Sequence, residues 1–144
     1  MDRNKKMTII SNSVLLGWFF LDMVGVYFRD NILVTRSYKE DGIYFIIFAF
    51  TFLLFLLKDK IGKYMLLLWL FLWFATQFYS HWYFTLFGPW EGRRIYFADT
   101  IKMIPSSNIY IPDLYHIVLH LLILISLGSL IIFLISLRKR SVRK

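Results

Sequence analysis

The sequence predicts an all-α integral membrane protein with four transmembrane helices in an up-down bundle. Of its 144 residues, 58% are hydrophobic and 20% are aromatic, whereas soluble domains are apolar at about half of their positions. The hydrophobic residues form long blocks separated by charged clusters, which is typical of a polytopic membrane protein. A chain of this length predicts one domain, residues 1–144. The sequence contains no cysteine, which excludes disulfides, thiolate metal sites and iron–sulfur clusters.

Four hydrophobic blocks predict the four spans, because a helix needs about 20 residues to cross the hydrocarbon. The first, third and fourth predicted spans are residues 7–28, 64–87 and 114–137. The second, residues 43–57, is short, so either the helix borrows a turn from the preceding loop or the bilayer thins around it. A re-entrant segment is the alternative, and the alternation of charge along the chain argues against it.

The charges between the spans predict the orientation. Residues 1–6 and 58–63 each carry three basic side chains against one acidic, and the tail 138–144 carries five basic side chains and none acidic. The other two loops balance at three basic and three acidic side chains each. Cytoplasmic segments carry the excess of Lys and Arg, so both termini are predicted cytoplasmic in a multi-pass cell-membrane protein. The net charge of +8 is then explained by topology and by anionic lipid, and no nucleic-acid partner is predicted.

The long loop of residues 88–113 is predicted to lie on the outer side. Phe97, Ile101 and Ile104 recur there at helical spacing, which indicates a short interfacial helix, with a solvated linker as the alternative. Arg93 and Arg94 are predicted to steer phosphate or lipid headgroups toward a pocket mouth, and a solvated loop is again the alternative.

Ionisable groups inside the spans predict a polar pocket, since such groups are costly in a membrane and mark functional sites. Asp22, His81 and His120 each lie six residues, or about 9 Å, below the outer end of their span. His116 lies one turn above His120 on the same face, and Gln77 lies one turn from His81. Asp113, which follows Pro112, is predicted to be a helix-start residue.

The predicted chemistry of this outer-leaflet pocket is the binding of a metal or of a polar or lipid ligand. His116, His120, His81 and Asp22 offer nitrogen and oxygen ligands, which suit Zn, Fe or Mn better than Cu(I). Asp22, His81 and His120 would then carry metal-assisted chemistry on a membrane-accessible substrate, with Gln77 beside the ligand.

Three alternatives remain open from the sequence. Haem held between His81 and His120 is one, and a proton relay without a cofactor is another. The third is a non-catalytic accessory subunit, whose partner beyond the lipid bilayer is another membrane protein or a second copy of the chain. The sequence leaves open whether the protein is an enzyme.

Overall fold

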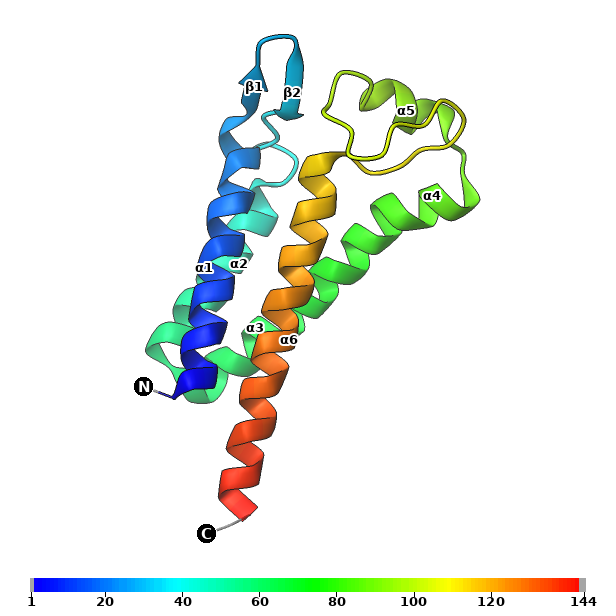
Figure 1. Ribbon diagram of the computed structural model, residues 1–144. Coiled ribbons are helices and arrows are strands. Elements are labelled where there is room, and N and C mark those ends of the chain that lie inside the picture. The colour runs from blue at the N-terminus through cyan, green and yellow to red at the C-terminus, as the bar shows by residue number, and fades with distance from the viewer. Residues whose placement is uncertain (1, 143–144) are drawn as a thin grey trace.

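The computed structural model describes residues 2–142 as a long helical bundle with a small cap of strands and loops at one end (Figure 1). Arg143 and Lys144, two of the basic residues of the predicted cytoplasmic tail, lie outside the described residues. In chain order the elements are α1 (Arg3–Val24), β1 (Val26–Phe28), β2 (Asn31–Val34), α2 (Gly42–Leu57), α3 (Asp59–Gln77), the π-helix η1 (Phe78–Tyr83), α4 (Phe84–Phe87), α5 (Glu91–Tyr96) and α6 (Leu114–Val142).

The structure is mostly helical, and three helical stretches are long and apolar enough to cross a membrane. They are Arg3–Val24, Asp59–Phe87 and Leu114–Arg140. The second predicted span corresponds to α2, which has 16 residues. At 1.5 Å per residue α2 is about 24 Å long, shorter than the roughly 30 Å of hydrocarbon in a typical bilayer.

The first helix ends at Val24, four residues before the predicted end of the first span. Gly25 ends it with a φ of 76°, a left-handed conformation that glycine adopts without a steric penalty. The chain then forms an antiparallel hairpin in which Tyr27 pairs with Ile32 and Phe28 with Asn31. These strands were not predicted, because a short run of aromatic and β-branched residues next to a long apolar block has the composition of a helix end.

The charged segment 58–63, expected as a loop, is almost entirely helical. Only Lys58 separates α2 from α3, so the two helices run antiparallel and pack closely (Figure 1). Gly62 makes this approach feasible, because a Cβ at this position would lie 2.3 Å from the carbonyl carbon and oxygen of Leu54. The third helix therefore begins five residues before the predicted span.

The outer loop departs from the predicted interfacial helix. The helix α5 covers only Glu91–Tyr96, and Phe97, Ile101 and Ile104 all follow it. The chain after α5 runs beside the hairpin instead, since the Ile101 amide donates to the Ile32 carbonyl at 2.9 Å. This segment is therefore not helical, and a single β-bridge to the hairpin holds it over the end of the bundle.

Aromatic side chains fill the core between the helices. Phe19 and Phe48 lie against Trp73 with ring centroids 4.6 and 5.3 Å away, and Phe55 meets Phe133 edge-on. Large apolar side chains such as those of Phe50, Phe71, Leu121 and Ile125 project outward from α2, α3 and α6. A bundle that exposes such residues along its length suits a lipid environment.

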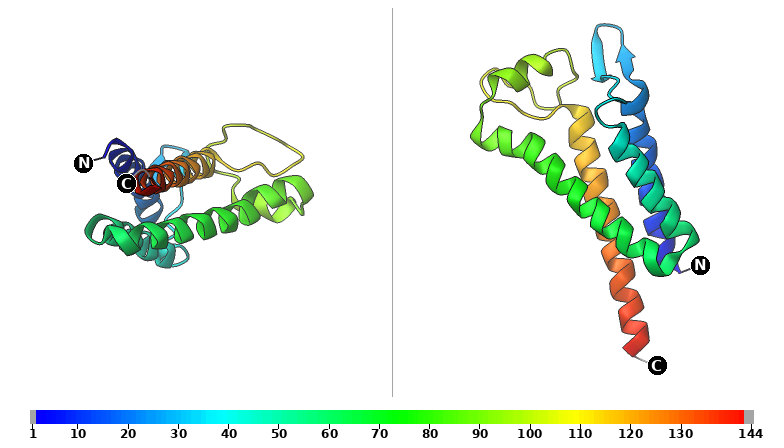
Figure 2. Two further views of the ribbon diagram at one scale, coloured as in Figure 1. Left: turned by 90° about the horizontal axis from the view of Figure 1, so that it is seen from below. Right: turned by 180° about the vertical axis from the view of Figure 1, so that it is seen from behind.

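The two ends of the bundle differ. Both termini lie at one end, and the hairpin and α5 lie at the other (Figure 2). Two ion pairs tie the first end together, with Lys5 3.3 Å from Asp59 and Arg140 3.1 Å from Asp2. The predicted site residues lie toward the opposite end, beneath the hairpin and the outer loop.

Candidate functional site

A polar pocket of about 160 Å³ lies beneath the hairpin and the outer loop. The structure places four of the predicted site residues on its wall, namely Asp22, Gln77, His81 and His116, together with Asp113. The remaining lining side chains are Val34, Thr35, Ser37, Asp41, Ser80, Tyr96, Phe97 and Thr100. No lysine or arginine is among these lining residues, so the pocket is acidic.

The π-helix η1 carries His81 into the site. Such helices are rare and occur frequently at functional sites, and this one interrupts the long helix that runs from Asp59 to Phe87. His81 is buried, and its Nδ1 lies 2.5 Å from the hydroxyl of Tyr110. Burial raises the pKa of Tyr110, so the phenol stays protonated and its O–H donates to Nδ1. Tyr110 was missed from the sequence because nothing in a loop tyrosine indicates this partner.

His116 is held by Asp113, which is itself almost completely buried. One carboxyl oxygen, Oδ1, accepts from the backbone amide of His116 at 2.9 Å and from its ring Nδ1 at 2.7 Å. Burial alone would raise the pKa of Asp113, but the hydrogen bonds and the charge of His116 lower it below its ordinary value. Donation through Nδ1 fixes the orientation of the ring, and within residues 2–142 Nε2 of His116 has no hydrogen-bond partner.

His120 lies one turn deeper, and both of its ring nitrogens have partners. Trp82 donates its indole N–H to Nδ1 at 2.9 Å, so the ring proton is on Nε2, which faces Oε1 of Gln77 at 3.2 Å. Gln77 is thereby occupied in orienting a histidine. His120 supports the wall of the site and does not line the pocket.

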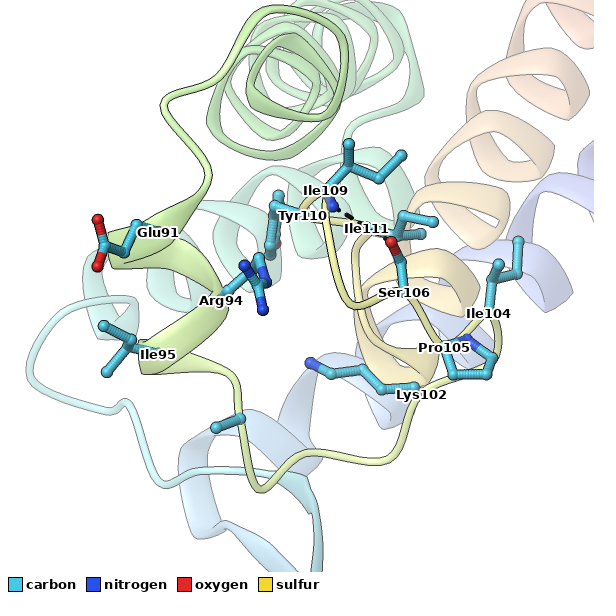
Figure 3. A pocket seen from close by; sticks show the side chains of 11 residues that line it. Glu91, Arg94, Ile95, Lys102, Ile104, Pro105, Ser106, Ile109, Tyr110 and Ile111 are labelled. Carbon is cyan, nitrogen blue, oxygen red and sulfur yellow. Dashed lines mark hydrogen bonds between the residues drawn. The ribbon is translucent and has the colours of Figure 1, made fainter.

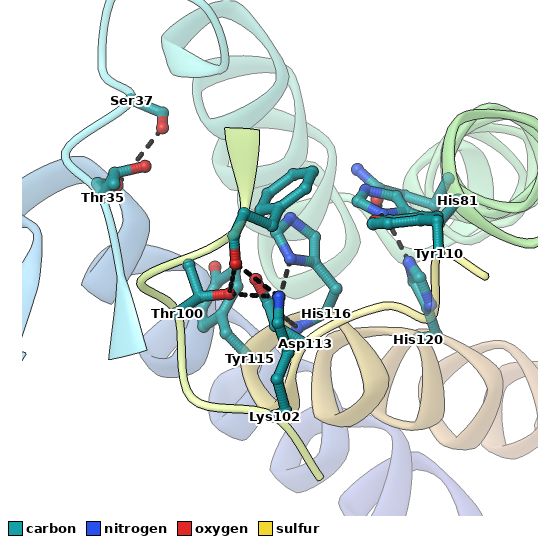
Figure 4. A network of polar contacts seen from close by, with 12 residues as sticks. Thr35, Ser37, His81, Thr100, Lys102, Tyr110, Asp113, Tyr115, His116 and His120 are labelled. Carbon is teal, nitrogen blue, oxygen red and sulfur yellow. Dashed lines mark hydrogen bonds and ion pairs between the residues drawn. The ribbon is translucent and has the colours of Figure 1, made fainter. Parts of the chain in front are cut away.

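The three histidines form one cluster (Figure 4). The ring of His81 lies 4.2 Å from that of His116 and 5.3 Å from that of His120, between centroids. Within residues 2–142, no group of three or more His, Cys, Asp or Glu side chains is arranged to hold a metal ion. The nitrogens instead face Tyr110, Asp113 and Trp82.

Two carboxyl groups meet on the side of the pocket next to α2. Asp22 near the end of α1 and Asp41 just before α2 both line this side and lie close enough for their charges to interact. Burial raises the pKa of Asp41 above its ordinary value. The amide of Ser37 donates to the main-chain oxygen of Asp22 at 2.9 Å and brings the loop over the pair. Asp41 was not among the predicted site residues, because the sequence places it in a charged loop and not in a span.

The two arginines predicted to serve headgroups lie elsewhere. The guanidinium of Arg93 is 4.3 Å from the centre of the Phe84 ring, over which it stacks. Arg94 lines a separate and larger pocket of about 490 Å³ between α5 and the following loop (Figure 3). Neither arginine is on the wall of the Asp/His pocket.

No protein-family model matches this chain, and comparisons with curated proteins and with solved structures find no match either.

Proposed function

We propose that this chain is a four-span membrane protein whose Asp/His pocket faces the outside and binds a small, positively charged organic ligand such as an amine. The observation that carries the proposal is the convergence of Asp22, Asp41 and Asp113 on one pocket that has no basic residue except histidine. A cation there would stabilise the carboxylates that burial otherwise penalises.

The size of the pocket limits the ligand. A volume of about 160 Å³ corresponds to roughly five water molecules at about 30 Å³ each, which suits an amine of a few heavy atoms. Tyr96 and Phe97 are also on the wall, and aromatic rings attract cations. His116, oriented by Asp113, adds a polar ring to the same wall.

The four-span topology is supported by the arrangement of the ends. The helix α3 returns along α2 after one linking residue, and both termini lie at the same end, which fits an even number of crossings (Figure 1). The basic residues of 3–6, 58–63 and 138–140 gather at that end, which favours its cytoplasmic location. A reporter fused after Lys144 is expected to report the cytoplasm, and an external signal would contradict this orientation.

The ligand proposal is tested on purified protein in lipid nanodiscs by thermal unfolding, followed through tryptophan fluorescence. Methylammonium and ethanolamine at millimolar concentration are expected to raise the Tm of the native chain, because a ligand that binds only the folded state stabilises it. Glycerol, which has no charge, is expected to leave the Tm unchanged. Asp22→Asn and Asp41→Asn should abolish the response, whereas the matched control Asp30→Asn, at the exposed hairpin turn, should retain it.

Two results would contradict the proposal. One is an amine response that survives in both Asp22→Asn and Asp41→Asn, which would place the binding elsewhere. The other is stabilisation by Zn²⁺ or Mn²⁺ with none by the amines, which would assign the pocket to a metal. A native chain that responds to neither class would favour the accessory-subunit alternative.

A further inference from the structure

The larger pocket beside α5 has the composition of an anion site with apolar walls. One wall is α5 with Arg94 and Ile95, and the other is the segment that carries Lys102, Ile104 and Ile109 (Figure 3). Its volume of about 490 Å³ is roughly three times that of the Asp/His pocket.

The position of this pocket is at the ends of two membrane spans. The spanning helix that ends at Phe87 is followed by α5 after three residues, and the loop on the other wall leads into Leu114, the first residue of α6. The pocket therefore lies where a spanning protein leaves the hydrocarbon, at the depth of the lipid headgroups.

Two cations share this space. Lys102 donates from Nζ to the carbonyl of Phe97 and to Oγ1 of Thr100, which fixes the ammonium and leaves one of its three N–H donors for a ligand. Burial lowers the pKa of Lys102, so an adjacent anion would favour its charged form. Within residues 2–142 neither Arg94 nor Lys102 forms a salt bridge, and the carboxyl group of Glu91 points away from both (Figure 3).

The apolar part of the pocket indicates an amphiphile. Ile104 and Ile109 lie on the wall of this pocket and are 52% and 37% exposed. A free inorganic anion would gain nothing from these side chains, whereas acyl chains would cover them.

We infer that Arg94 and Lys102 bind the phosphate of an anionic phospholipid, whose acyl chains pack on Ile104 and Ile109. The guanidinium provides paired N–H donors for phosphate oxygens, and the ammonium provides a point charge. This site is separate from the amine pocket and does not depend on that proposal.

The inference is tested by native mass spectrometry of the full chain released from nanodiscs of equimolar phosphatidylglycerol and phosphatidylcholine. The native protein is expected to retain one phosphatidylglycerol in preference to phosphatidylcholine. The double variant Arg94→Gln/Lys102→Gln should lower this occupancy about tenfold or more, since two charge-assisted contacts are lost. The matched control Arg36→Gln/Lys39→Gln removes the same two charges from the 35–41 loop at the same end of the bundle, and should keep the lipid.

Three outcomes would overturn the inference. Equal loss of lipid from the control would show that net charge alone attracts it. Unchanged retention by Arg94→Gln/Lys102→Gln, with a Tm that shows the variant folded, would exclude these residues as the partners. Displacement of the lipid by millimolar inorganic phosphate would show that the site recognises free phosphate and not a phospholipid.

Discussion

A single carboxyl oxygen of Asp113 joins the start of α6 to the candidate site, because it accepts hydrogen bonds from both the backbone amide and the ring of His116. The amide bond is that of an N-cap, which satisfies one of the free N–H groups of the first helical turn. The ring bond sets the orientation of the imidazole toward the pocket. Fold and site therefore depend on the same atom.

Substitution of Asp113 is expected to cost more stability than substitution of His116. Asp113→Ala removes both the N-cap hydrogen bond and the hydrogen bond to the ring, and should lower the free energy of unfolding by about 2–4 kcal/mol. His116→Ala leaves the N-cap hydrogen bond in place. Asp113→Asn keeps an oxygen for the cap and should cost less than Asp113→Ala. Unfolding in mixed micelles with increasing SDS, followed by the helical circular dichroism signal, measures all three variants. An equal cost for Asp113→Ala and His116→Ala would contradict the double role.

Gly62 is expected to be essential to the contact between α2 and α3. In Gly62→Ala the new methyl group would overlap the main chain of Leu54, which cannot move without separating the helices. The expected loss is about 1–3 kcal/mol or more in the same unfolding assay. Gly128→Ala is the matched control, because a Cβ at Gly128 meets nothing within 4 Å, and there alanine should be neutral or stabilising. Similar losses in both variants would show that helix packing does not set the requirement for glycine at residue 62.

The hydrogen bond from Trp82 to His120 is expected to stabilise the fold. Trp82→Phe leaves Nδ1 of His120 without its donor, at a cost of about 1–3 kcal/mol beyond the lost ring volume. Trp69→Phe controls for the volume, since the indole N–H of Trp69 is buried without a hydrogen-bond partner in the described chain. The difference in unfolding free energy between the two variants isolates the hydrogen bond. No difference would mean that His120 finds another donor.

The carboxyl group of Asp41 is expected to make stability depend on pH. Its pKa is raised by burial above the ordinary 3.8, so its protonated form stabilises the fold, and this contribution is lost as the pH rises through the raised pKa. Asp41→Asn, which cannot ionise, should therefore gain in Tm over the native chain as the pH increases from about 4, near the ordinary pKa, to about 7. The gain should be about 2–4 °C for each kcal/mol, measured by thermal unfolding in nanodiscs at both pH values. Asp30→Asn, at an exposed position, should show no such trend, and a gain at low pH only would reverse the assignment.

The long helices were predictable because they depend on local composition. Apolar blocks of sufficient length must form helices in a membrane, where every backbone polar group needs an internal partner. The depths of Asp22, His81, His116 and His120 followed from the helical rise, and the structure brings these residues toward one end of the bundle. The helix ends were predicted less accurately. Gly25 ends α1 through its backbone conformation and Gly62 permits close contact between α2 and α3, and neither effect is visible in the hydropathy.

What the sequence determined by itself was the class of protein and the helices that carry its ionisable groups. Only the tertiary structure decided which partner each group has, since hydrogen bonds such as those from Tyr110 to His81 and from Trp82 to His120 join residues 29 and 38 positions apart. The same packing brought Asp41 to Asp22 and placed hydrogen-bonded histidines near both carboxyl groups. Spacing along a helix fixes the depth and face of a side chain, but its chemistry depends on what the neighbouring elements place against it.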